Sequence, residues 1–156
     1  MNKRSNMKLL MSLFSLSILM PVAALADISG RHPAYLHGLS DLRTAYWLLD
    51  HRPGDPAVHH DEDVALSQVY DAVKEIQAAS ITDGKDMHDH PPVDAPPERL
   101  GRLHKALEFL NSAHADVAQE EDDPATQGLK HRALGHIDAA TQATERAIAA
   151  AGGSKP

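Results

Sequence analysis

The chain repeats itself, and the repeat limits the folds that it can adopt. The motif Asp55-Pro56-Ala57 recurs as Asp123-Pro124-Ala125, at an offset of 68 residues. Apolar residues that follow each motif match at the same offset without a gap: Ala65 with Ala133, Leu66 with Leu134, Val69 with Ile137 and Ala72 with Ala140. The spacing of these matches is helical. Since a repeat marks a repeated structural unit, the sequence predicts two similar helical hairpins.

The upstream part of each copy matches at a different offset. Pro33, Leu36 and Leu39 correspond to Pro97, Leu100 and Leu103 at an offset of 64 residues. The second copy therefore has four more residues before its Asp-Pro pair, which is about one helical turn. A polar, proline-rich linker at residues 83–96 separates the copies.

The first 26 residues have the features of a secretory signal peptide. Lys3, Arg4 and Lys8 precede an uncharged run from Leu9 to Val22, and Ala24-Leu25-Ala26 places small residues at a cleavage site. The apolar run is shorter than the roughly 20 residues of a spanning helix. We therefore expect cleavage before Asp27, no stable membrane anchor afterwards, and a periplasmic or secreted protein.

The composition of the mature chain excludes several classes of function. The chain has no cysteine, so disulfides, thiolate metal sites and covalent haem are absent. Removing the leader takes away three positive charges and lowers the formal net charge from −7 to −10. An acidic surface repels nucleic acid and anionic lipid and favours cationic partners, including metal ions.

Helical periodicity predicts the fold. The predicted units are a first hairpin at 33–82, the linker at 83–96, a second hairpin at 97–150 and a disordered tail at 151–156. Pro33 and Pro56 suit helix starts, and Gly152-Gly153 suits a helix end. Four helices with short hairpin loops predict an all-α protein, an antiparallel up-down-up-down four-helix bundle.

Two polar positions on these helices have structural interpretations. In the third helix, the stripe Leu100, Leu103, Leu107, Leu110, His114 and Val117 predicts a packing seam. His114 is then half-buried without an adjacent carboxylate, and desolvation lowers the pKa of its ring. Residues 59–63, HHDED, lie in the first turns of the second helix, and their carboxylates complement the helix dipole without any further role.

No catalytic motif occurs in the sequence. The GxSxG elbow, the P-loop, GxGxxG and HExxH are all absent. The Glu-x-x-His pairs of di-iron carboxylate bundles are absent as well. We therefore expect a protein that is not an enzyme.

The remaining chemical clue is the histidine content. All eleven histidines lie in the mature chain, and imidazole suits copper, zinc and nickel. In an up-down-up-down bundle the linker shares one end with the beginnings of the first and third helices. The sequence thus predicts a site for a divalent transition metal at that end, with these ligands: His88, His90, His37, His104, Asp86 and Asp89.

The linker also has a purely structural interpretation. Pro91-Pro92 and Pro96-Pro97 stiffen the segment, and Asp89 or Asp94 can accept hydrogen bonds from its backbone. A metal-free bundle that binds another envelope protein or a small ligand is the alternative function.

In size, export signal, histidine content and lack of cysteine, the mature chain resembles small histidine-rich periplasmic metal-binding proteins with helical-bundle folds. The resemblance implies a metal-buffering or carrier role. Histidines in such proteins recur regularly along the helices, whereas here they cluster at ends and loops, so the resemblance assigns no ligand.

Overall fold

The computed structural model describes residues 32–52, 59–79, 84–119 and 127–153. These ranges contain four helices and no strand: α2 (Pro33–Asp50), α3 (His60–Ala78), α4 (Arg99–Gln119) and α5 (Gln127–Gly153). The predicted all-α helical bundle is confirmed. The leader and both Asp-Pro pairs lie outside the described residues, and α5 continues through Gly152-Gly153 instead of ending before it.

Local sequence explains how the first two helices begin. Pro33 occupies the first turn of α2, where the missing backbone N–H costs no intrahelical hydrogen bond. Asp61, Glu62 and Asp63 lie in the first turn of α3, where negative charge complements the helix dipole.

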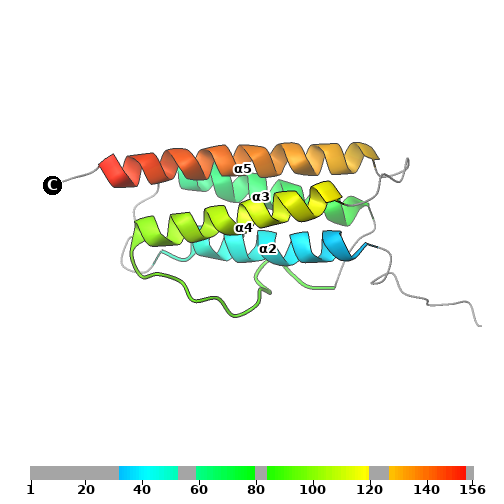
Figure 1. Ribbon diagram of the computed structural model, residues 1–156, viewed down its shortest axis with the longest axis horizontal. Helices are drawn as coiled ribbons and strands as arrows, with labels where there is room; N and C mark the ends of the chain where they lie inside the picture. The colour runs from blue at the N-terminus through cyan, green and yellow to red at the C-terminus, as the bar shows by residue number, and fades with distance from the viewer. Residues whose placement is uncertain (1–31, 53–58, 80–83, 120–126, 154–156) are drawn as a thin grey trace, which may run out of the picture.

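The four helices surround one core, and each helix contacts two neighbours. The largest interfaces join α3 to α5 and α2 to α4, while α4–α5 and α2–α3 complete the ring. Gly38, early in α2, lies against Val117, late in α4. Arg102, early in α4, donates a hydrogen bond to the carbonyl of Leu48, late in α2. The helices α2 and α4 are therefore antiparallel (Figure 1).

Two ion pairs show the same relation between α3 and α5. Glu75, late in α3, pairs with Arg132, early in α5, and Asp61, early in α3, pairs with Arg146, late in α5. Neighbouring helices around the ring thus run in opposite directions, and α3 and α4, on a diagonal, run in the same direction (Figure 1).

The predicted up-down-up-down order is accordingly not confirmed. The chain runs up, down, down and up, so the segment between α3 and α4 has to travel the length of the bundle, about 30 Å for a 21-residue helix. Residues 84–98, called the crossover below, contain no helix or strand and run along the side of α2 (Figure 1).

One hydrogen bond joins two positions that the predicted repeat relates. Gln68 and His136, which are equivalent at the offset of 68, hydrogen-bond to each other across the α3–α5 interface at 2.9 Å. When two helices related by a repeat pack antiparallel, there is one point at which matching residues face each other.

Small side chains allow the helices to approach closely. Alanine is the commonest buried residue of the core, and an added Cβ at Gly38 would lie 2.9 Å from Cγ2 of Val117. The core face of α4 consists of Leu103, Ala106, Leu110, Ala113 and Val117. The predicted seam is therefore wrong at Leu100, which is 38% exposed, and at Leu107 and His114, whose places Ala106 and Ala113 take.

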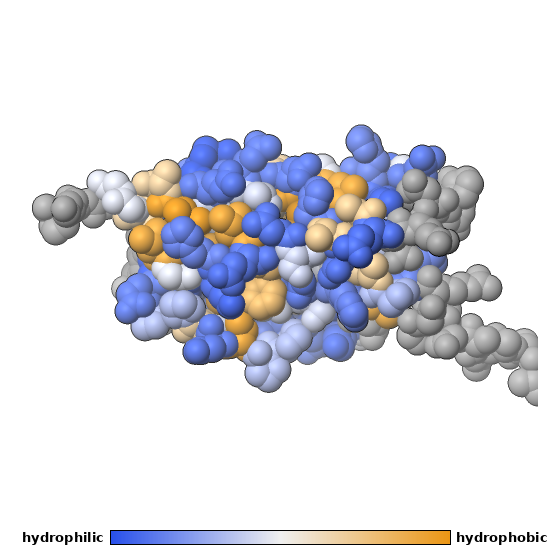
Figure 2. Space-filling view, in the orientation of Figure 1, coloured by the Kyte–Doolittle hydropathy of each residue, from blue (hydrophilic) through white to orange (hydrophobic). Residues whose placement is uncertain are grey.

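The surface over α4 and α5 is largely hydrophilic, with apolar side chains gathered toward the end where α4 begins and α5 ends (Figure 2). Within the described ranges, no helix combines the length and the apolar character needed to cross a membrane.

Candidate functional site

The outer face of α2 collects aromatic and imidazole rings. Tyr46 and Trp47 project from consecutive positions of α2, and the crossover places His88 against Tyr46, with 6.0 Å between ring centroids. His90 lies 4.7 Å from Trp47, and His51, at the end of α2, stacks on the same indole at 4.6 Å with an interplanar angle of 10°. We call these five residues the α2 ring cluster.

Burial sets the chemistry of the one phenol in the α2 ring cluster. Desolvation raises the pKa of Tyr46 above its ordinary value of 10.0, and Asp50 and Tyr70 raise it further. The hydroxyl is therefore protonated at neutral pH. It can donate a hydrogen bond there.

One hydrogen bond to a main-chain carbonyl also fastens the crossover to α2. Arg43, fully buried in α2, donates from a terminal guanidinium nitrogen to the carbonyl of Lys85 at 3.2 Å. Further on, Nδ1 of His90 lies 2.8 Å from the carbonyl oxygen of Pro91. The histidines of the crossover therefore lie over α2 in one defined arrangement.

The predicted aspartate ligands take part in the fold of the crossover. Oδ1 of Asp86 accepts the backbone N–H of His88 at 2.7 Å, and Oδ2 of Asp89 accepts the backbone N–H of Asp86 at 3.1 Å. One carboxylate oxygen of each residue thus satisfies a loop donor, as the structural interpretation expected for Asp89. Both side chains are exposed.

The structure does not bring His37 and His104 to the crossover histidines. His37 precedes Tyr46 by nine residues, which is about 13 Å along α2 and half a turn around it. It lies instead near Asp41. His104 is exposed on α4. Among the described residues, no three histidine, aspartate or glutamate side chains are close enough together to hold one metal ion.

The sequence did not single out His51 as a partner of the crossover. In the expected up-down-up-down order, the end of α2 and the linker lie at opposite ends of the bundle. The crossover instead runs toward the end of α2, and this direction brings His90 and His51 to the same indole.

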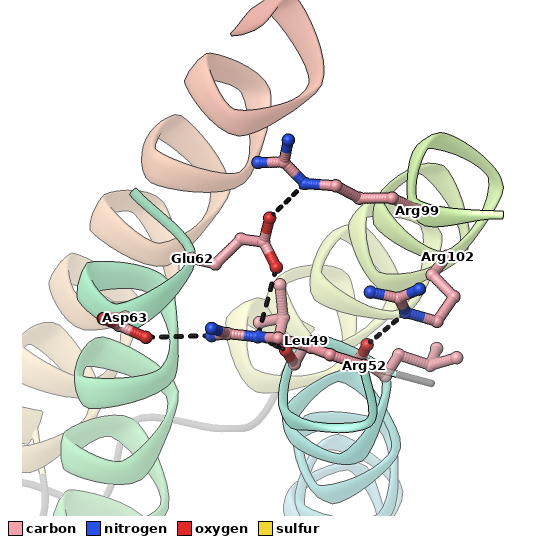
Figure 3. A network of polar contacts seen from close by, with 7 residues as sticks. Leu49, Arg52, Glu62, Asp63, Arg99 and Arg102 are labelled. Atoms are coloured by element: carbon pink, nitrogen blue, oxygen red, sulfur yellow. Dashed lines mark hydrogen bonds and ion pairs between the residues drawn. The ribbon is translucent and has the colours of Figure 1, made fainter. Parts of the chain in front are cut away.

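A second polar cluster lies where α2 ends and α3 and α4 begin (Figure 3). Glu62 is fully buried, and its two carboxylate oxygens lie 2.6 Å from Nε of Arg99 and 3.3 Å from Nε of Arg52. Arg52 also reaches Asp63 at 2.8 Å. The expectation that Glu62 only complements the helix dipole is therefore wrong, because it joins three helices.

His114 is not the desolvated histidine that the seam predicted. Its side chain is 42% exposed, and Nε2 lies 3.2 Å from Oδ1 of Asp138 on α5. The prediction placed this ring in the packing seam and without an adjacent carboxylate, and the structure contradicts both features.

No protein-family model, curated protein or solved structure matches this chain. The function must therefore be argued from its own residues.

Proposed function

We propose that this protein is an exported, non-enzymatic helical bundle that binds a divalent transition metal, copper, zinc or nickel, in a buffering or carrier role. One observation carries the proposal: three imidazoles from two chain segments, His51, His88 and His90, lie on the adjacent rings Tyr46 and Trp47. Imidazole nitrogen is a preferred ligand of all three metals.

The proposed ligand set differs from the sequence prediction in one respect. His88 and His90 remain, and His51 replaces His37 and His104 because it shares the Trp47 indole with His90. The second oxygen of Asp86 or Asp89, or a water molecule, completes the coordination. The acidic chain attracts the cation.

Binding requires a local rearrangement. Metal–nitrogen bonds are about 2.0–2.1 Å long, so the imidazoles of His51 and His90 have to leave the indole and turn toward one ion. The crossover has no helix or strand to break in doing so. Bound metal then ties the crossover to the end of α2 and stabilises the folded state by mass action. Acid opposes binding, because a protonated imidazole is no ligand.

Calorimetric titration of residues 27–156 with copper, zinc and nickel tests the proposal. The double variant His88→Ala with His90→Ala should lose most of the affinity and the metal-dependent rise in melting temperature. The matched control is His104→Ala with His131→Ala, which removes two exposed imidazoles from α4 and α5. Trp47, the single tryptophan, should change its fluorescence on binding.

Each other outcome has a definite meaning. Equal, small losses in both double variants would mean diffuse binding by surface histidines. Loss of metal affinity in the control alone would move the site to α4 and α5. Unchanged affinity in the His88→Ala, His90→Ala variant would overturn the proposal.

A further inference from the structure

A cleft of about 250 Å³ separates α3 from the first residues of the crossover, away from the proposed ligands His51 and His90. Its lining combines apolar, aromatic and charged side chains: Tyr70, Val73, Lys74, Gln77, Lys85, Asp86 and Met87. Tyr70 is 44% exposed, unusually open for a large ring in this bundle.

We propose that this cleft binds a small carboxylate with a single aromatic ring. The ring of the ligand packs against Tyr70 and Met87, and its carboxylate pairs with the ammonium of Lys74. The proposal does not rest on metal binding, although Asp86, one of the two alternative aspartate ligands, also lines the cleft.

Size selects the class of ligand. Pockets for drug-sized molecules span about 300–1,000 Å³, whereas a cavity of about 150 Å³ accommodates benzene. A cleft of about 250 Å³ therefore suits one ring with a small polar substituent. Val73, which is only 3% exposed, forms an apolar wall, and the flexible thioether of Met87 adapts to a ring.

Charge selects the polar substituent. Two lysines and one aspartate line the cleft, so its local charge is positive although the chain as a whole carries −7. Nζ of Lys74 lies over the Tyr70 ring, 5.3 Å from its centroid, so a ligand ring packed beside Tyr70 places its carboxylate within reach of that ammonium. One oxygen of Asp86 is already engaged by the backbone N–H of His88.

The test uses benzoate as the probe, with residues 27–156 followed by two-dimensional amide NMR. Saturable shifts should appear at residues 70–77 and 84–87, with a dissociation constant of about 1 mM. Acetate, which lacks the ring, and benzyl alcohol, which lacks the charge, should each bind at least about tenfold more weakly.

Two variants locate the site. Tyr70→Ala and Lys74→Met should each weaken benzoate binding by about tenfold. The control is Lys105→Met, because Lys105 lies 5.6 Å from the Phe109 ring in a similar pairing on α4 but lines no part of the cleft. Equal weakening by the control, shifts confined to other residues, or equal binding of acetate would overturn the proposal.

Discussion

Oε1 of Glu62 accepts a hydrogen bond from Nε of Arg99 at 2.6 Å, although 37 residues separate the two in sequence. The carboxylate is fully buried, and Arg52 approaches its other oxygen at 3.3 Å. One carboxylate thus neutralises guanidinium groups from the end of α2 and the start of α4, within the first turn of α3 (Figure 3).

Removing this carboxylate should destabilise the fold strongly. Glu62→Ala leaves two arginines near the core without their shared counter-charge, and breaking a buried ion pair costs about 3 kcal/mol in free energy of unfolding. Chemical denaturation followed by circular dichroism measures the loss. Glu108→Ala is the control, because Glu108 pairs with Lys105 on the exposed face of α4. Exposed pairs contribute less than about 1 kcal/mol, so equal losses in both variants would contradict the assignment.

Two glycines should respond oppositely to the same substitution. Glycine within a helix costs about 0.5–1 kcal/mol relative to alanine. Gly135→Ala on α5 should recover that energy, because nothing lies within 4 Å of its added Cβ. Gly38→Ala should instead destabilise by about 1 kcal/mol, since its Cβ would lie 2.9 Å from Cγ2 of the buried Val117.

The cause of the Gly38 effect can be isolated with a second substitution. Val117→Ala removes the opposing methyl groups, so Gly38→Ala should be harmless or stabilising in that background. A Gly38→Ala loss that persists with Ala at 117 would assign the effect to something other than the α2–α4 contact.

Periodicity in the sequence was sufficient to predict the helices but not their order. The helix start predicted at Pro33 agrees with α2, because the preference of proline for the first turn of a helix is a local property. The order depends on where the linker goes. Residues 83–96, extended at about 3.3 Å per residue, can cover the end of a bundle or span its length, and the sequence alone does not distinguish the two.

The buried charges were missed for a related reason. Glu62 lies on the same stripe as Ala65, Val69 and Ile76, so its spacing placed it on the buried face of α3. The sequence did not reveal its partner, Arg99. The two residues come close only because α3 and α4 both begin at the same end of the bundle (Figure 1). A charged residue in register with an apolar stripe was the available clue.

Asp41 should make the fold more stable on mild acidification. Burial raises the pKa of its carboxyl above 3.8, and Asp116 raises it further, while a hydrogen bond from Ser112 and the charge of His37 act in the opposite direction. The folded state therefore holds this proton more tightly than the unfolded chain. The carboxylate costs stability above the raised pKa, and the cost disappears as the pH falls through it toward 3.8.

Asp41→Asn measures this contribution. The variant should have a higher free energy of unfolding than the wild type at neutral pH, and the difference should shrink as the pH falls through the raised pKa of Asp41 toward 3.8. Urea denaturation at several pH values follows the two proteins. A difference that does not change with pH would show that the carboxyl is not desolvated.

The direction of the crossover leads to the last prediction, which concerns its length. The helix α4 has 21 residues, so the end of α3 and the start of α4 lie about 30 Å apart. Four extended residues reach only about 13 Å, whereas fourteen reach about 46 Å. Replacing residues 79–98, the whole connection between α3 and α4, by four Gly/Ser residues, enough for a hairpin loop, should therefore prevent the monomeric bundle from forming.

The matched variant replaces the same segment with fourteen Gly/Ser residues. This connection is still long enough to span the bundle. It loses the contacts of His88 and His90 with α2 and the packing of Met87, Val93 and Ala95 on the core. It should remain a helical monomer with a lower melting temperature. Circular dichroism and size-exclusion chromatography distinguish the variants. A stable monomer with the four-residue loop would mean that α3 and α4 can run antiparallel, and the order up, down, down, up would then be wrong.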